Sequence, residues 1–83
     1  MSGTLVDARG LRCPLPVIRL AAAARELPPG TELTVLSTDP AVRLDVPAWC
    51  RMRGHEHVTT REVHDADWAG WAVTVRLGPP RAT

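Results

Sequence analysis

The sequence contains no lysine, so all ten of its basic residues are arginines. A Schiff-base mechanism needs a lysine amine and is therefore excluded. The arginines are scattered along the chain among nine acidic residues, and the net charge is only +1. A nucleic-acid-binding domain usually carries a clustered basic patch or stripe. The sequence shows neither, so we expect no direct binding of nucleic acid.

Long hydrophobic runs and targeting signals are missing as well. The longest apolar stretch, Leu15 to Ala24, is interrupted by Arg19 and is shorter than the about 20 residues that span a bilayer. No charged start followed by an apolar run marks a signal peptide. Two cysteines without such a signal do not form a disulfide scaffold. These absences predict a cytoplasmic protein that does not contact a membrane and whose thiols stay reduced.

The chain shows no repeat, linker or low-complexity segment, so we expect one domain over residues 1–83. Adjacent prolines at positions 79 and 80 cannot continue a strand, and residues 78–83 are predicted to form a flexible tail. A domain of this size buries roughly 60–65% of its unfolded surface, which leaves no room for a deep active site. We therefore expect a monomer whose chemistry lies at a helix end or an edge and involves a partner protein.

Hydrophobic periodicity predicts strands over residues 4–8, 32–38, 57–63 and 71–77, and a first helix over residues 14–27. Pro47 complicates the second helical segment, because proline inside a helix costs about 3 kcal/mol. We therefore expect one turn over residues 40–44 and a separate helix over residues 46–53, capped by Asp45 and ended by Gly54. With right-handed crossovers, the βαβαββ order predicts an α+β fold. It is a two-layer α/β sandwich with both helices on one face of a four-stranded mixed sheet.

Cys13 is the residue most suited to chemistry, because it immediately precedes the first predicted helix. Free N–H groups and the positive end of the helix dipole stabilise a thiolate at such a position. Arg9 and Arg12 add positive charge nearby. We therefore expect the pKa of Cys13 to lie below its unperturbed value of about 8.5, which makes the sulfur a nucleophile.

The residues around Cys13 favour an exposed reactive loop over a buried structural cysteine. Gly10 allows a turn, and two arginines flank the thiol. Pro14 and Pro16 stiffen the first helical turn and hold the sulfur in one place. A buried structural cysteine remains the alternative at this position.

Three further residues are predicted to lie near the thiol. Leu15 points about 160° away from Val17 on a helical wheel, so we expect it to be exposed beside Cys13 and to contact a partner. Arg19 is expected to belong to a basic rim around Leu15. Asp39 is predicted to be a helix cap where the second helical segment starts. Because both helices start at the same sheet edge, it should also lie near the Cys13 loop and shape its rim.

The remaining candidates are interpreted as structural. Cys50 shares a helical face with Val46 and Trp49, so we expect it in the core, and no Cys-x-x-Cys pair is present. His55 and His57 share one face of a strand, but a structural zinc site needs four ligands, so we expect no metal. We expect both histidines to lie on a solvated edge. Trp68 is expected to be exposed in the last hairpin, where it gives a weak hint of a contact surface.

The segment from Asp7 to Pro16 resembles the signature of the TusA/SirA-like sulfur-carrier family, which combines an Asp, a Gly-Leu pair and Cys-Pro-x-Pro. The segment from Thr38 to Ala41 resembles a second landmark of that family. The segment from Val46 to Cys50 resembles its Pro-x-aromatic-Cys stretch, and Gly54-His55-Glu56 follows in the familiar place. The resemblance covers about Leu5 to Leu77, and its most specific part is the cysteine motif.

This resemblance implies the same βαβαββ fold and a sulfurtransferase that uses no cofactor. Cys13 matches the cysteine that accepts sulfane sulfur as a persulfide from a cysteine desulfurase or a rhodanese-like donor. A downstream acceptor protein then serves tRNA thiolation, molybdenum-cofactor maturation or sulfur oxidation. A non-catalytic regulatory module of the same fold, with an idle Cys13, stays open as the alternative. A thiol–disulfide oxidoreductase is disfavoured because the second thiol is missing. The hairpin around Trp68 matches no family landmark, which leaves the partners open.

Overall fold

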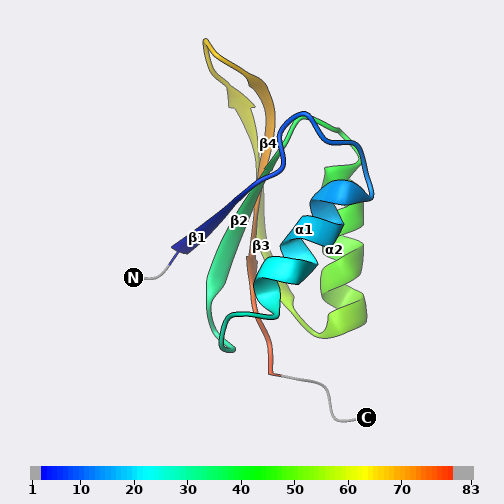
Figure 1. Ribbon diagram of the computed structural model, residues 1–83, viewed down its shortest axis with the longest axis vertical. Helices are drawn as coiled ribbons and strands as arrows, with labels where there is room; N and C mark the ends of the chain where they lie inside the picture. The colour runs from blue at the N-terminus through cyan, green and yellow to red at the C-terminus, as the bar shows by residue number, and fades with distance from the viewer. Residues whose placement is uncertain (1–2, 80–83) are drawn as a thin grey trace.

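The computed structural model describes residues 3–79 (Figure 1). Its elements are β1 (Gly3–Asp7), α1 (Leu15–Ala24), β2 (Glu32–Ser37), α2 (Val42–Arg53), β3 (Glu56–His64) and β4 (Ala69–Arg76). The strands form one sheet in the order β1-β2-β4-β3. The pair β1–β2 is parallel, whereas β2–β4 and β3–β4 are antiparallel. The predicted βαβαββ order and mixed four-stranded sheet are confirmed.

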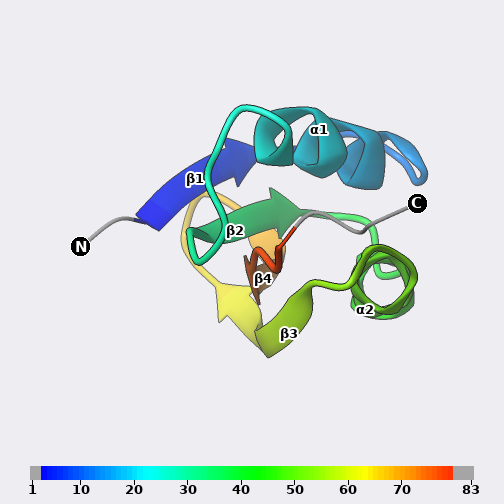
Figure 2. The ribbon, with the colours of Figure 1, turned by 90° about the horizontal axis from the view of Figure 1, so that it is seen from below.

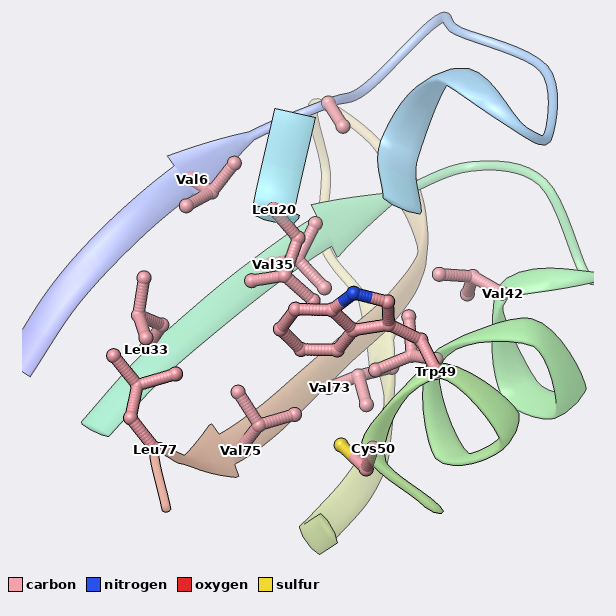
Figure 3. Packing of buried hydrophobic residues seen from close by; sticks show 12 residues of the cluster. Val6, Leu20, Leu33, Val35, Val42, Trp49, Cys50, Val73, Val75 and Leu77 are labelled. Atoms are coloured by element: carbon pink, nitrogen blue, oxygen red, sulfur yellow. The ribbon is translucent and has the colours of Figure 1, made fainter. Parts of the chain in front are cut away.

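Both helices lie on the same face of the sheet, as Figure 2 shows. Buried side chains from the helices and from the sheet form one core cluster. Residues of β2 alternate between the two faces, with Leu33, Val35 and Ser37 pointing into the core. The buried side chains come from every layer (Figure 3): Val6, Leu20, Leu33, Val35, Val42, Val46, Trp49, Cys50, Val73, Val75 and Leu77. The opposite face is open, and there the Thr34 and Thr74 hydroxyls share a hydrogen bond of 2.8 Å. The predicted two-layer sandwich is therefore correct.

Helix α1 presents the predicted face to the core, but it is shorter than predicted. Leu20 is fully buried, and Val17, Ala21, Ala24 and Leu27 pack against the core cluster. Beyond Ala24 the chain tightens into i→i−3 turns, with Leu27 N–H donating to Ala24 O at 3.2 Å. The prolines at positions 28 and 29 explain why the helix ends here, because proline disfavours the helical conformation of the residue that precedes it. Pro16 is also buried, which the periodicity did not predict.

Helix α2 is continuous, so the predicted break before residue 46 is wrong. The helix begins at Val42, earlier than expected, and directly follows a turn in which Asp39 Oδ1 accepts the Ala41 N–H at 2.9 Å. Asp45 lies inside the first turn, where its N–H donates to Ala41 O at 2.9 Å. Pro47 removes only the single bond that its N–H would give to the Arg43 carbonyl, close to the helix start. Gly54 ends the helix with a φ of 77°, as predicted.

The last strand begins at Ala69, two residues earlier than expected, and continues the hairpin from β3. Arg76 on β4 forms ion pairs with Glu32 at 2.7 Å and Glu56 at 2.9 Å. At the start of the predicted flexible tail, Gly78 N–H donates to His55 Nδ1 at 3.0 Å, so this residue is held. Residues 80–83 of that tail lie outside the described residues. Within residues 3–79, neither helix is long and apolar enough to cross a membrane.

Candidate functional site

Cys13 lies in the connection between β1 and α1 and is partly buried. Its N–H donates to Asp39 Oδ2 at 2.9 Å, while the other oxygen of the same carboxylate binds the Ala41 N–H. One side chain therefore joins the cysteine loop to the start of α2. Figure 1 shows that the two helices begin at the same end of the sheet. The predicted proximity of Asp39 to the cysteine loop is confirmed. The predicted helix cap is not, because α2 begins at Val42 after Ala41 without a side-chain cap, and Asp39 instead binds the Ala41 N–H in the turn before the helix.

Gly10 provides a second tie between the same two connections. Its N–H donates to Thr38 Oγ1 at 3.0 Å, and its φ of 82° is in the left-handed region that favours glycine. A shallow depression lies between the two segments and is lined by Gly10, Leu11, Arg12, Thr38, Asp39 and Pro40. The loop that carries Cys13 thus donates two backbone hydrogen bonds to side chains of the β2–α2 connection, which hold it in place.

The surroundings of Cys13 raise the pKa of its thiol to about 12. Partial burial is the largest cause, followed by a hydrogen bond to the Asp45 carboxylate and the negative charges of Asp45 and Asp39. The prediction of a lowered pKa is therefore wrong. In the free protein at neutral pH, Cys13 is a thiol and not a thiolate.

Two features explain why the start of α1 does not activate the thiol. Pro14 and Pro16 have no N–H to offer, and the Leu15 N–H donates to the Arg12 carbonyl at 2.9 Å. Two of the donors on which the prediction relied are thus absent or already used. The two prolines in the sequence already indicated that these N–H donors are missing.

Arg9 and Arg12, which were expected to add positive charge near the thiol, interact with other side chains. Arg9 Nη2 pairs with Asp7 Oδ2 at 2.7 Å, and its guanidinium lies 5.1 Å from the centre of the Trp68 ring. This pair holds the pKa of Asp7 at about 2. Trp68 is therefore half-buried and partnered, not freely exposed. Arg12 is exposed, and its charge helps to lower the pKa of Asp39, after the hydrogen bonds from the Cys13 and Ala41 N–H groups.

Exposed apolar side chains occur on both helices near the thiol. Leu15 is 47% exposed, which confirms the predicted helical phase, and Ile18 is 55% exposed one turn further along α1. Leu44 in the first turn of α2 is 76% exposed and directly precedes Asp45. Arg19 instead lines a second shallow depression with Asp7, Arg9, Leu11 and Trp68. The exposure of Leu15 was predicted from the sequence, that of Ile18 and Leu44 was not, and Asp45 was predicted only as a helix cap.

Cys50 and the two histidines have separate structural surroundings. Cys50 is 2% exposed in the last turn of α2, and burial raises its pKa to about 11, which confirms its predicted place in the core. The His55 ring lies 4.7 Å from the Trp49 ring, whereas His57 Nε2 is 2.7 Å from Thr60 Oγ1. Among residues 3–79, no three potential metal ligands come together.

Comparison with known proteins agrees with this geometry. The sequence matches the family described as "Sulfurtransferase TusA" over residues 4–76. It is 48% identical over 62 residues to a sulfur carrier protein TusA of Pseudomonas fluorescens (strain SBW25), covering 75% of this chain and 74% of that protein. TusA proteins of Pseudomonas paraeruginosa (strain DSM 24068 / PA7) and Pseudomonas putida (strain W619) are 47% and 43% identical over 58 residues. These matches cover 70% of this chain and 73% and 72% of the relatives. The chain therefore belongs to the TusA sulfurtransferase family.

Proposed function

We propose that this protein is a cytoplasmic sulfur carrier that holds sulfane sulfur as a persulfide on Cys13. The observation that supports it most directly is the position of Cys13, a free and partly exposed thiol in a loop tied to α2 by Asp39. Membership of the TusA family and the names of its relatives support the same function. The donor is a cysteine desulfurase or a rhodanese-like protein, and a downstream acceptor protein receives the sulfur.

The chemistry balances without a cofactor or an external oxidant. Cys13 Sγ attacks the terminal sulfur of the donor persulfide, R–S–SH, and the donor S–S bond breaks. The Cys13 proton ends on the donor sulfur, so the products are Cys13–S–SH and R–SH. An acceptor thiol reverses this step and regenerates the Cys13 thiol. A loop at the molecular surface suits this exchange, because the terminal sulfur must enter a site on another protein.

Leu15 supplies an apolar anchor for that contact, and Arg19 a charge at its edge. A small interface needs few anchors, and an exposed apolar residue next to the reacting atom is well placed to be one. Leu15 follows Cys13 by two residues and is 47% exposed. The role of both residues in partner binding belongs to this proposal.

Mass spectrometry after incubation with a cysteine desulfurase and free cysteine tests the function. We expect a gain of one sulfur atom on Cys13 in the Cys50→Ala protein and none in the Cys13→Ser protein. An unmodified Cys13 would instead favour the regulatory module, to which the thiol form of Cys13 in the free protein lends some support. An internal disulfide in the unmutated protein would favour an oxidoreductase.

A further inference from the structure

An open cavity of about 350 Å³ lies where the two helices end. Its wall comes from the last part of α1, the last residue of α2 and the residues that follow α2 and β4. In Figure 1 both helices end at the lower side of the sheet, away from the connection that carries Cys13. The cavity is therefore separate from the candidate site around the thiol, and its volume is within the range of about 300–1,000 Å³ that is usual for small-molecule sites.

Much of the cavity wall is apolar. Ala24 and Leu27 contribute to it from α1 and the turn after this helix, and Trp49 and Leu77 contribute from the core cluster. Figure 3 shows the indole ring of Trp49 and the side chain of Leu77 among the other core residues. An apolar wall that includes an aromatic ring suits a ligand with a ring of its own.

The part of the wall around His55 is held in one arrangement by several contacts. The His55 ring lies 4.7 Å from the Trp49 ring, and its Nδ1 accepts the Gly78 N–H at 3.0 Å. A Cβ at Gly78 would collide with the Gly54 carbonyl oxygen, so only glycine allows the chain to pass this close to the end of α2. These contacts form the wall before any ligand binds, which reduces the cost of ordering it.

Two arginines add positive charge to this apolar cavity. Arg25 directly follows α1, and Arg53 is the last residue of α2. Over residues 3–79, no ion pair within 4.0 Å includes either arginine, and no acidic residue lines the cavity. Basic residues are also favoured at helix ends by the helix dipole, so this position alone does not indicate a ligand. The indication is that both arginines line one preformed apolar cavity.

We propose that this cavity binds a small aromatic carboxylate. The ring of the ligand lies against Trp49 and Leu77, where it is removed from water. The carboxylate lies beside Arg25 and Arg53, whose guanidinium groups form paired, charge-assisted hydrogen bonds with such an anion. The Cys13 sulfur takes no part in this binding, so the proposal does not rest on the proposed function.

The test is a titration of the full chain with phenylacetate, followed by the amide NMR signals of the protein. We expect saturable shifts at Ala24, His55 and Gly78, which line the cavity. Phenylacetamide has nearly the same shape without the charge, and acetate has the charge without the ring. Both should bind about fivefold more weakly or less. Equal affinity for phenylacetate and phenylacetamide, or no saturable shift at these residues, would overturn the proposal.

Arginine variants separate the cavity from a general attraction of anions. Arg25→Gln and Arg53→Gln should each weaken phenylacetate binding about fivefold or more and leave phenylacetamide binding unchanged. The matched control is Arg51→Gln, because Arg51 is exposed in the same last turn of α2 and does not line the cavity. Equal weakening in the control would overturn the proposal.

Two other occupants of the cavity would also overturn it. Shifts of the lining amides that depend on protein concentration without ligand would identify a second copy of the chain. Nuclear Overhauser contacts from residues 80–83 to Trp49 would identify that segment of the chain itself.

Discussion

The Cys13 N–H donates to Asp39 Oδ2 at 2.9 Å, although 26 residues separate the two positions in the chain. The other oxygen of the same carboxylate accepts the Ala41 N–H at 2.9 Å, directly before α2 begins. The loop with the reactive sulfur and the helix that carries Asp45 are therefore fixed to each other by one side chain. This explains how a partly exposed thiol keeps a defined position without a lid.

Replacing Asp39 should destabilise the protein. Asp39→Ala removes the acceptor of two backbone N–H groups, so we expect the free energy of unfolding to fall in urea titrations. Asp39→Asn keeps one amide oxygen as an acceptor and should lose less. Asp67→Ala is the surface control. A loss no larger than that of the control would show that the two hydrogen bonds contribute nothing in solution.

Leu15→Asp should affect partner contact and not folding. The side chain is 47% exposed, so the thermal midpoint should hardly change. Persulfide transfer from the donor enzyme should slow, because the new charge must be desolvated in the complex, and transfer from a small-molecule sulfane donor should change less. The matched control is Leu5→Asp on the open face of the sheet, where Leu5 is 63% exposed.

Two results would contradict this role of Leu15. Unfolding of Leu15→Asp would mean that the residue packs in the core. Equal slowing with the protein donor and the small-molecule donor would mean that Leu15 acts on the thiol itself.

Local periodicity was enough to predict the layers of this fold. The apolar positions of residues 14–27 recur at helical spacing, and the structure packs that face onto the sheet. The phase of the same helix correctly placed Leu15 outside. These predictions succeed because burial of one face is decided by neighbours along the chain.

The predictions that failed depend on contacts between distant segments. Pro47 suggested a helix break, but α2 begins at Val42, so the proline costs a single hydrogen bond near the start of the helix. The low pKa expected for Cys13 followed from its position before a helix. Its pKa is raised instead, first by partial burial and then by Asp45 and Asp39, and all of these depend on the tertiary structure.

Cys50 should be needed for stability and not for transfer. It is 2% exposed in the core, so Cys50→Ala should lower the free energy of unfolding by about 1–2 kcal/mol through the small cavity left behind. Cys50→Ser should cost at least as much, because it buries a hydroxyl group in an apolar site. Sulfur loading of Cys13 should be retained in Cys50→Ala. Loss of loading in a folded variant would assign Cys50 a part in the chemistry.

His55 should make stability depend on mildly acidic pH. Burial is the main cause that lowers its pKa, with a smaller effect of the Arg53 charge, and the neutral ring accepts the Gly78 N–H at Nδ1. A folded pKa below the unfolded value of about 6.5 means that the unfolded chain binds more protons in this range. The stabilisation from neutral His55 is therefore present above about pH 6.5 and is lost as the pH falls through the folded pKa.

Urea unfolding between about pH 7.5 and 5.5 measures this effect while most carboxylates stay ionised. The unmutated protein should lose stability as the pH falls across this range. His55→Gln keeps a side chain that can accept the Gly78 N–H but cannot titrate, so its stability should change less with pH. His64→Gln is the control, because His64 is exposed at the end of β3 and its replacement should leave the pH slope as it was. If the pH dependence of stability disappears in His64→Gln and persists in His55→Gln, it arises from His64 and not from His55.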